Sequence, residues 1–279
     1  MSAALTAPGT ISASGKYHLA NPITVNGGYA FTVSGASTIE VNLNGFQILD
    51  ASTGNAMSAA FYAPDPSYTN LVILGGSIKG FRHGVQSAMP YTRVQEVDFS
   101  GNKYIGANLQ GSVSRAILCV ADGIGGVTDE AYAIVINMTG ADGFIEGGEF
   151  RNIYRQAGAS SSLVGEGCPI NAQGAGITIR RNFLENDTGA DKTIAIFTGA
   201  SGGQIIERND TYNFKVALQD ALAGGSITVR RNTFVLPAAV GGSKAIWAEA
   251  GLASKNTLIG YETPISGGIT DDQTNTVYP

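Results

Sequence analysis

Charged and titratable side chains gather in four short stretches near the middle of the sequence. Their types suit β-elimination from a uronate sugar, which needs a cation on the carboxylate, a base for the α-proton and an acid for the leaving oxygen. Arg82 or Arg155 would supply the cation, and these stretches also hold His83 and Tyr154 as candidate base and acid. An ordinary role as solvated loop residues stays open for all of them. The full set is Lys79, Arg82 and His83; Lys103 and Tyr104; Asp122, Asp129 and Glu130; and Arg151, Tyr154 and Arg155.

Two other chemistries would use carboxylates instead. Calcium needs a close group of oxygen ligands, and Asp122, Asp129 and Glu130 form the best such group, although they match no known spacing. We therefore expect no metal or other cofactor, with Ca²⁺ as the alternative. Glycoside hydrolysis needs two carboxylates. The candidate pairs are Asp187 with Asp191, and Asp210 with Asp220.

A repeat indicates which elements must position these residues. Three short β-rich segments end in the same Arg-Asn pair, and successive pairs lie 27 and 23 residues apart: Arg181-Asn182, Arg208-Asn209 and Arg231-Asn232. A unit of this length cannot bury its apolar face alone, so it must stack on its neighbours. The sequence thus predicts an all-β solenoid of roughly nine coils, about 40 Å long at about 4.8 Å per strand.

The repeat also predicts how the coils hold together. Asn at a fixed corner, in the left-handed conformation, would bond its amide to the equivalent Asn one coil away. Inward positions would stack like on like. Charges at one repeat position alternate in sign along consecutive coils, which predicts a ladder of ion pairs with a structural role. That ladder comprises Glu146, Arg180, Glu207 and Arg230.

Composition agrees with a folded β-protein and excludes several classes. The 279 residues include 38 Gly without a three-residue period, which excludes collagen, and 43% are apolar against 14% charged, which excludes disorder. A net charge of −5 argues against nucleic acid as a partner. Cys119 and Cys168 are expected to be buried and unpaired. We expect neither a membrane span nor a secretory signal peptide.

Two segments resemble the right-handed parallel β-helix, pectin-lyase-like superfamily. Residues 15–23, GKYHLANPI, and 39–48, IEVNLNGFQI, are similar to its opening pattern GxYxLxxxI…VxLDLNGxxI, with Asn42 where the family usually has Asp. The later Ile-x-x-Asn-x-Phe copies resemble its coil repeat. The resemblance implies a single right-handed parallel β-helix with an N-terminal cap over residues 1–20, coils over 21–279 and a tail from about residue 251.

The resemblance also implies a place for the site. Substrate grooves of this superfamily run along the first sheet, which here would carry outward amides and a tryptophan suited to sugars. A merely solvated surface is the alternative for these amides. We expect Arg82, His83, Tyr154 and Arg155 to be catalytic. The expected substrate-binding residues are Gln86, Lys103, Tyr104, Asn108, Gln110, Asn137 and Trp247.

The scaffold hosts several functions, so three hypotheses stand. The first is an extracellular polysaccharide lyase acting on polyuronates. The second is a non-catalytic carbohydrate-binding or structural β-helix, similar to a phage tailspike or adhesin, and the third is a glycoside hydrolase. The expected partner is a polysaccharide, with the chain monomeric or homotrimeric and located outside the cell or on a virion or cell surface.

Overall fold

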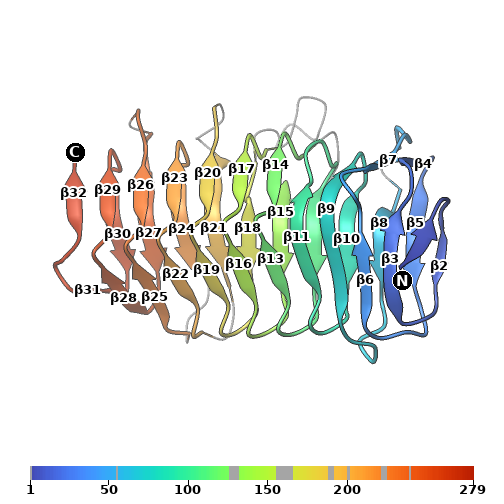
Figure 1. The fold of residues 1–279 in the computed structure, drawn as a ribbon. Coiled ribbons are helices and arrows are strands. Elements are labelled where there is room, and N and C mark those ends of the chain that lie inside the picture. Colours follow the sequence, from blue (N-terminus) through green and yellow to red (C-terminus); the bar gives the residue numbers. More distant parts are fainter. Residues whose placement is uncertain are drawn as a thin grey trace.

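The computed structural model describes residues 2–54, 56–125, 132–154, 166–187, 192–199, 202–220, 225–238 and 240–279. The secondary-structure elements of these ranges are all strands, so none of the ranges contains a helix long and apolar enough to cross a membrane. Every strand pairing is parallel, and the coils stack side by side along one axis (Figure 1). The all-β parallel β-helix predicted from the sequence is therefore confirmed.

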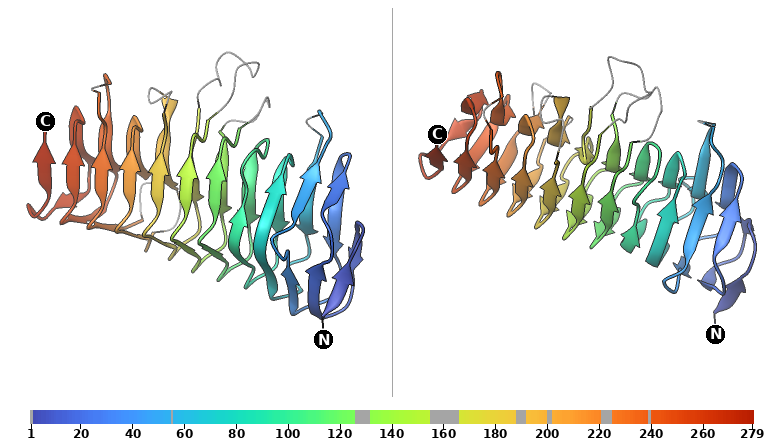
Figure 2. Two further views of the ribbon diagram at one scale, coloured as in Figure 1. Left: turned by 45° about the horizontal axis from the view of Figure 1, so that its top comes forward. Right: turned by 90° about the horizontal axis from the view of Figure 1, so that it is seen from above.

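Apart from the first and the last, each coil runs through three strand rows in a fixed order. The chain passes through row A1, row A2 and then sheet B, and it repeats this path along the rod. Rows A1 and A2 belong to one 21-stranded sheet A, because β9 (Leu71–Lys79) pairs with strands of both rows. The two termini lie at opposite ends of the rod (Figure 2).

Sheet B contains eleven strands, two more than the roughly nine coils expected. The strands are β2 (Gly9–Ile11), β5 (Gly28–Val33), β8 (Ser58–Ala63), β10 (His83–Ser87), β12 (Ile105–Leu109), β15 (Ile134–Met138), β18 (Ile170–Ala172), β21 (Ile194–Thr198), β24 (Val216–Asp220), β27 (Lys244–Ala248) and β30 (Thr263–Gly267).

Sheet A holds the other strands. Row A1 comprises β1 (Ala3–Leu5), β3 (Gly15–Leu19), β6 (Ile39–Asn42), the first parts of β9 and of β11 (Arg93–Asp98), β13 (Arg115–Ile117), β16 (Phe144–Glu146), β19 (Thr178–Arg180), β22 (Ile205–Glu207), β25 (Ile227–Arg230), β28 (Gly251–Ser254) and β31 (Thr270–Asp271). Row A2 comprises β4 (Ile23–Val25), β7 (Gln47–Asp50), the ends of β9 and β11, β14 (Val120–Asp122), β17 (Glu149–Arg151), β20 (Phe183–Glu185), β23 (Asp210–Tyr212), β26 (Thr233–Val235), β29 (Thr257–Ile259) and β32 (Thr276–Tyr278).

The ends of the chain take part in the same architecture. Within the segment expected to form a cap, β1 pairs with β3 in row A1 and β2 pairs with β5 in sheet B. The segment expected to form a tail contributes β28 to β32, which continue all three rows. Strand pairing thus begins at Ala3 and continues to Tyr278 in the last strand.

Like residues stack in the interior, as the repeat predicted. On row A1 a buried aliphatic position continues through Ile145, Ile179, Ile206 and Val229, each paired with the next. On sheet B the rings of Phe31 and Phe61 stack with centroids 5.3 Å apart. Burial of apolar area on every rung supplies the main favourable contribution to the free energy of folding.

The asparagine corner between rows A1 and A2 forms a buried hydrogen-bond ladder. Asn182 Nδ2 donates to Asn209 Oδ1 at 2.9 Å, Asn209 Nδ2 to Asn232 Oδ1 at 3.0 Å, and the series continues through Asn256 to Asn275. The predicted left-handed conformation belongs to the residue before Asn182, Asn209, Asn232 and Asn256, for example Arg181 at φ 55°. The prediction for Asn itself was wrong, because the preceding residue makes the turn and directs the Asn amide inward.

The charge ladder on row A1 is also confirmed. Glu146 pairs with Arg180, Arg180 with Glu207 and Glu207 with Arg230 in the strand register. Ion pairs of 2.8 Å join Arg180 Nε to Glu146 Oε1 and Arg230 Nε to Glu207 Oε2. These partly exposed pairs satisfy charges on the outer face of sheet A and leave sheet B free of this network.

Candidate functional site

A single row of outward side chains runs along sheet B and forms the candidate site. Members before the last strand lie between buried positions, as Gln86 does between Val85 and Ser87, so they point away from the core. The register pairs each member directly with the next. This outward row comprises Tyr62, Gln86, Asn108, Asn137, Asn171, Phe197, Gln219, Trp247 and Ser266.

Glycines beneath the row let the strands pack closely on the core. A Cβ atom on Gly84 would lie 2.8 Å from Phe99 Cδ1, and one on Gly106 would lie 3.0 Å from Phe99 Cβ. Larger residues at these two inward positions would displace the buried Phe99 ring. The glycines therefore fix where β10 and β12 present Gln86 and Asn108.

Amides of the outward row contact one another at the centre of the sheet. Asn137 Nδ2 donates to Asn108 Oδ1 at 2.9 Å, and Asn108 is only 7% exposed. The carbonyl oxygens Asn137 Oδ1 and Asn171 Oδ1 are buried without a hydrogen-bond partner among the described residues. The row thus has acceptor capacity that the protein itself does not use.

Aromatic rings flank these amides along the same row. Tyr62 stacks on Tyr29 with centroids 4.2 Å apart and planes 12° apart. Toward the C-terminus, the Lys244 ammonium lies 3.6 Å from the centroid of the Trp247 ring. Phe197 lies between these two positions on the row, two strands before Trp247. Rings are therefore interspersed with amides along the rod.

A cation, an imidazole and a phenol meet beside the amide row. The His83 and Tyr104 ring centroids are 5.5 Å apart, and the Arg82 guanidinium carbon lies 5.7 Å from the Tyr104 centroid. His83 Nδ1 lies 3.2 Å from Gln86 Oε1. Burial lowers the pKa of His83 to about 4, because only 5% of the residue is exposed, and the nearby Arg82 charge adds to this effect.

The expected catalytic residues do not form one described cluster. Arg82 and His83 lie together, whereas Tyr154 follows β17 in the coil that enters β18, three strand steps or about 14 Å along the sheet from β10. Arg155 lies outside the described residues. Tyr154 donates its backbone N–H to Ile124 O at 3.2 Å, which fixes its backbone against the preceding coil.

Lys103, Tyr104 and Gln110 occupy three different environments. Tyr104 contacts His83, whereas Lys103 Nζ donates to Ser52 O at 2.9 Å and lies 3.6 Å from the buried Asp50 Oδ2. Gln110 is exposed directly after β12. Lys103 therefore links its own corner to the corner two coils earlier, and Tyr104 lies closer to the outward row.

The carboxylates proposed for other chemistries are dispersed. Asp122 accepts from Asn152 Nδ2 at 3.0 Å on row A2, while Asp129, Glu130 and Asp191 lie outside the described residues. Asp210 is on sheet A and Asp220 on sheet B, where Asp220 is buried and accepts from Thr198 Oγ1 at 3.0 Å. Within the described ranges, no three His, Cys, Asp or Glu residues are placed to hold a metal ion.

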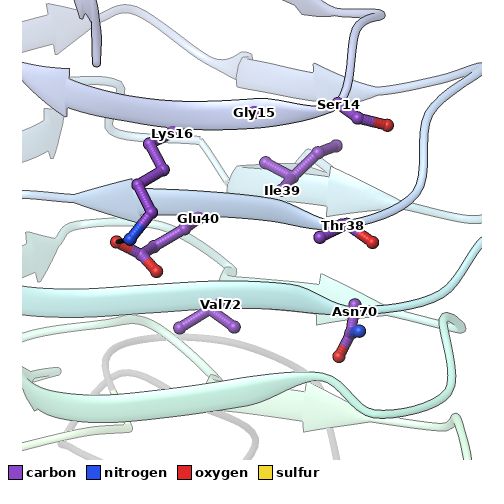
Figure 3. Close-up of a pocket in the computed structure, with 8 residues that line it drawn as sticks. All are labelled: Ser14, Gly15, Lys16, Thr38, Ile39, Glu40, Asn70 and Val72. Atoms are coloured by element: carbon purple, nitrogen blue, oxygen red, sulfur yellow. Dashed lines mark hydrogen bonds and ion pairs between the residues drawn. The ribbon is translucent and has the colours of Figure 1, made fainter. Parts of the chain in front are cut away.

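A hollow of about 500 Å³ on the outer face of row A1 is a weaker candidate (Figure 3). Lys16 and Glu40 lie across it and pair at 3.1 Å, so each satisfies the other's charge. Its remaining lining is Ser14, Gly15, Thr38, Ile39, Asn70 and Val72, without an aromatic ring. The hollow lacks the amides and rings that sheet B presents in one row.

Sequence reasoning missed four members of the outward row, namely Tyr62, Asn171, Phe197 and Ser266. A local signal exists for the first three: each follows a buried residue at the strand position of Val85, where Phe61, Ile170 and Ile196 stand. Aligning that buried position across coils would have found them. The expected members Gln86, Asn108, Asn137 and Trp247 all lie on the row.

Comparison with known proteins identifies the fold. No family model and no curated protein matches the sequence. Among solved structures the chain is similar to the Dettilon tailspike protein (gp208), with a TM-score of 0.54 and 13% sequence identity. The match covers 99% of this chain and 60% of that one, so the chain spans about three fifths of the tailspike chain.

Proposed function

We propose that this protein binds a polysaccharide along the outer face of sheet B. The observation that carries the proposal is the outward row, in which each strand from β8 to β27 presents an amide or an aromatic ring. Strands spaced about 4.8 Å apart offer one such side chain per step. A periodic surface of this kind suits an extended polymer better than a compact ligand.

The chemistry of the row matches sugars. An amide both donates and accepts, as a sugar hydroxyl does, and an aromatic face packs against the apolar face of a pyranose. Of the row members, none is charged. Recognition would therefore rest on hydrogen bonds and ring packing, with Lys244 beside Trp247 as a nearby cation.

The structural similarity to a protein named a tailspike supports this proposal at the level of fold. A place outside the cell, on a virion or on a cell surface is consistent with binding surface glycans. A monomer and a homotrimer remain the two expected states, and light scattering of the purified chain distinguishes them.

Affinity electrophoresis through gels containing single polysaccharides tests the proposal. We expect retardation by at least one polysaccharide of a panel of capsular, lipopolysaccharide-derived and plant polymers, and Trp247→Ala should weaken binding about tenfold through loss of ring packing. Leu252→Ala, at an exposed position on row A1, is the matched control and should bind normally. Equal weakening by both variants, or no retardation by any polymer, would contradict the proposal.

A second candidate, β-elimination, has one observation in its favour: Arg82, His83 and Tyr104 meet beside Gln86. Arg82 would neutralise a uronate carboxylate, and the neutral His83 or the Tyr104 phenol would transfer protons. Tyr154, three strand steps along the sheet from β10, and Arg155 stay as proposed participants. Polyuronates incubated with the protein should then gain the absorbance of a new C=C bond, lost in His83→Ala. New reducing ends without that absorbance would indicate hydrolysis.

A further inference from the structure

A cavity opens on the outer face of sheet B, across the rungs of β15, β18 and β21. Its volume is about 180 Å³, against about 30 Å³ for one water molecule. Ile134, Cys168 and Ile194 occupy one equivalent position on the three rungs, while Asn171 and Phe197 are consecutive members of the outward row. The complete described lining is Tyr132, Ile134, Cys168, Asn171, Gln173, Ile194 and Phe197.

The lining combines apolar walls with amide groups and includes no charged side chain among the described residues. Two isoleucines and the Phe197 ring form the walls. Asn171 Oδ1 has no hydrogen-bond partner in the described structure, and the same holds for Asn137 Oδ1 one strand earlier. An unpaired buried acceptor is unfavourable in the free protein, so a ligand that donates to it recovers binding free energy.

These features select an uncharged group with both an apolar end and an N–H donor. A carboxylate would face carbonyl oxygens without a described cation in the lining, and a plain hydroxyl would leave the apolar walls unfilled. An acetamido group satisfies both needs: its methyl packs against Ile134, Ile194 and Phe197, and its N–H donates to Asn171 Oδ1. The terminal torsion of Asn is soft enough to turn this oxygen toward the cavity.

We infer that the cavity is a subsite for the N-acetyl group of a 2-acetamido sugar within the bound polysaccharide. Gln173, exposed at the rim, supplies an amide N–H for the acetyl carbonyl. The inference rests on the proposed polysaccharide binding and adds the class of sugar recognised. It uses a different observation, the cavity with its unpaired oxygen, from the one that carries that proposal.

Saturation-transfer-difference NMR with small probes tests the subsite directly. The probes are the methyl glycosides of N-acetylglucosamine and N-acetylgalactosamine, each compared with the methyl glycoside of glucose or galactose. We expect the strongest saturation on the acetyl methyl of at least one acetamido probe, with about tenfold weaker binding of its hydroxyl counterpart. Absence of acetyl-methyl saturation with both acetamido probes would overturn the inference.

Variants separate the subsite from the rest of the row. Asn171→Leu removes the acceptor, Ile194→Phe fills the cavity, and Gln173→Ala changes an exposed side chain, so a folding defect would not explain its effect. Each should abolish or weaken the acetyl-methyl signal, whereas Leu252→Ala on row A1 should retain it. Retained signals in all three variants would refute the cavity as the subsite. If polysaccharides retard the protein but show no preference for acetamido sugars, this inference alone is refuted. If no polysaccharide retards the protein, the proposed function is refuted.

Discussion

Replacing Asn209 by Ala should destabilise the rod from its interior. Asn209 Oδ1 accepts from the Asn182 backbone N–H at 3.1 Å and from Asn182 Nδ2 at 2.9 Å, while Asn209 Nδ2 donates to Ile179 O and Asn232 Oδ1, each at 3.0 Å. The Ala variant leaves the buried Asn182 N–H without this acceptor. One orphaned buried donor costs about 1–3 kcal/mol and each of the three other lost bonds about 1 kcal/mol, so we expect a loss of about 4–6 kcal/mol.

Asn275 provides the matched control, because it makes the same ladder contacts at the open end. Its side-chain oxygen accepts from Asn256 N and Nδ2, both at 2.8 Å, but Asn275 itself is only half-buried. Water can replace its amide, so Asn275→Ala should cost at most about 1 kcal/mol. Urea unfolding followed by circular dichroism measures both variants. Equal losses, or a loss below about 1 kcal/mol for Asn209→Ala, would refute the argument that the ladder is buried and cooperative.

Three further predictions concern charge and protonation. Arg180→Ala should lower the free energy of unfolding by about 1 kcal/mol, measured by urea unfolding, with a smaller effect at about 1 M salt because the Glu146 pair is partly exposed. His83 has a pKa near 4 when folded against 6.5 in an exposed chain, so the unfolded state binds a proton first as pH falls. The free energy of unfolding should therefore decline by up to about 3 kcal/mol as the pH falls from about 6.5 to 4. His83→Gln should flatten this dependence of stability on pH, and an unchanged dependence would contradict the assignment of the effect to His83. Burial raises the pKa of Cys119 and Cys168 to about 12, so neither thiol should react with a disulfide reagent at about pH 8 until the protein unfolds.

The fold was predictable because stacking constrains the interior of every coil. The same Asn must return at each corner, yet 27, 23, 24 and 19 residues separate successive members of the ladder. Variable loops lengthen or shorten a coil without changing what faces inward. The repeated corner residues were therefore enough to predict the stacked β-solenoid. The left-handed backbone conformation expected for the corner Asn is instead adopted by Arg181 and its equivalents.

The candidate site was only partly predictable because outward positions are free of that constraint. Gln86, Asn108 and Asn137 are amides and could be aligned by type, whereas Tyr62 and Phe197 share their row but not their chemistry. Contacts between loop residues of different coils, such as the Arg82 guanidinium with the Tyr104 ring, depend on side-chain directions that spacing does not give.

Two rows of asparagine along the same rod show why residue type alone could not separate structure from function. The Asn209 side chain is hydrogen-bonded to the neighbouring coils through both its oxygen and its nitrogen, so neither atom is available to a ligand. Asn171, on the outward row, keeps an unpaired oxygen among the described residues. Removing an unsatisfied acceptor relieves its cost, so Asn171→Leu should melt no lower than the wild type while losing its acetamido preference. A lowered melting temperature together with unchanged sugar selectivity would mean that Asn171 is structural after all.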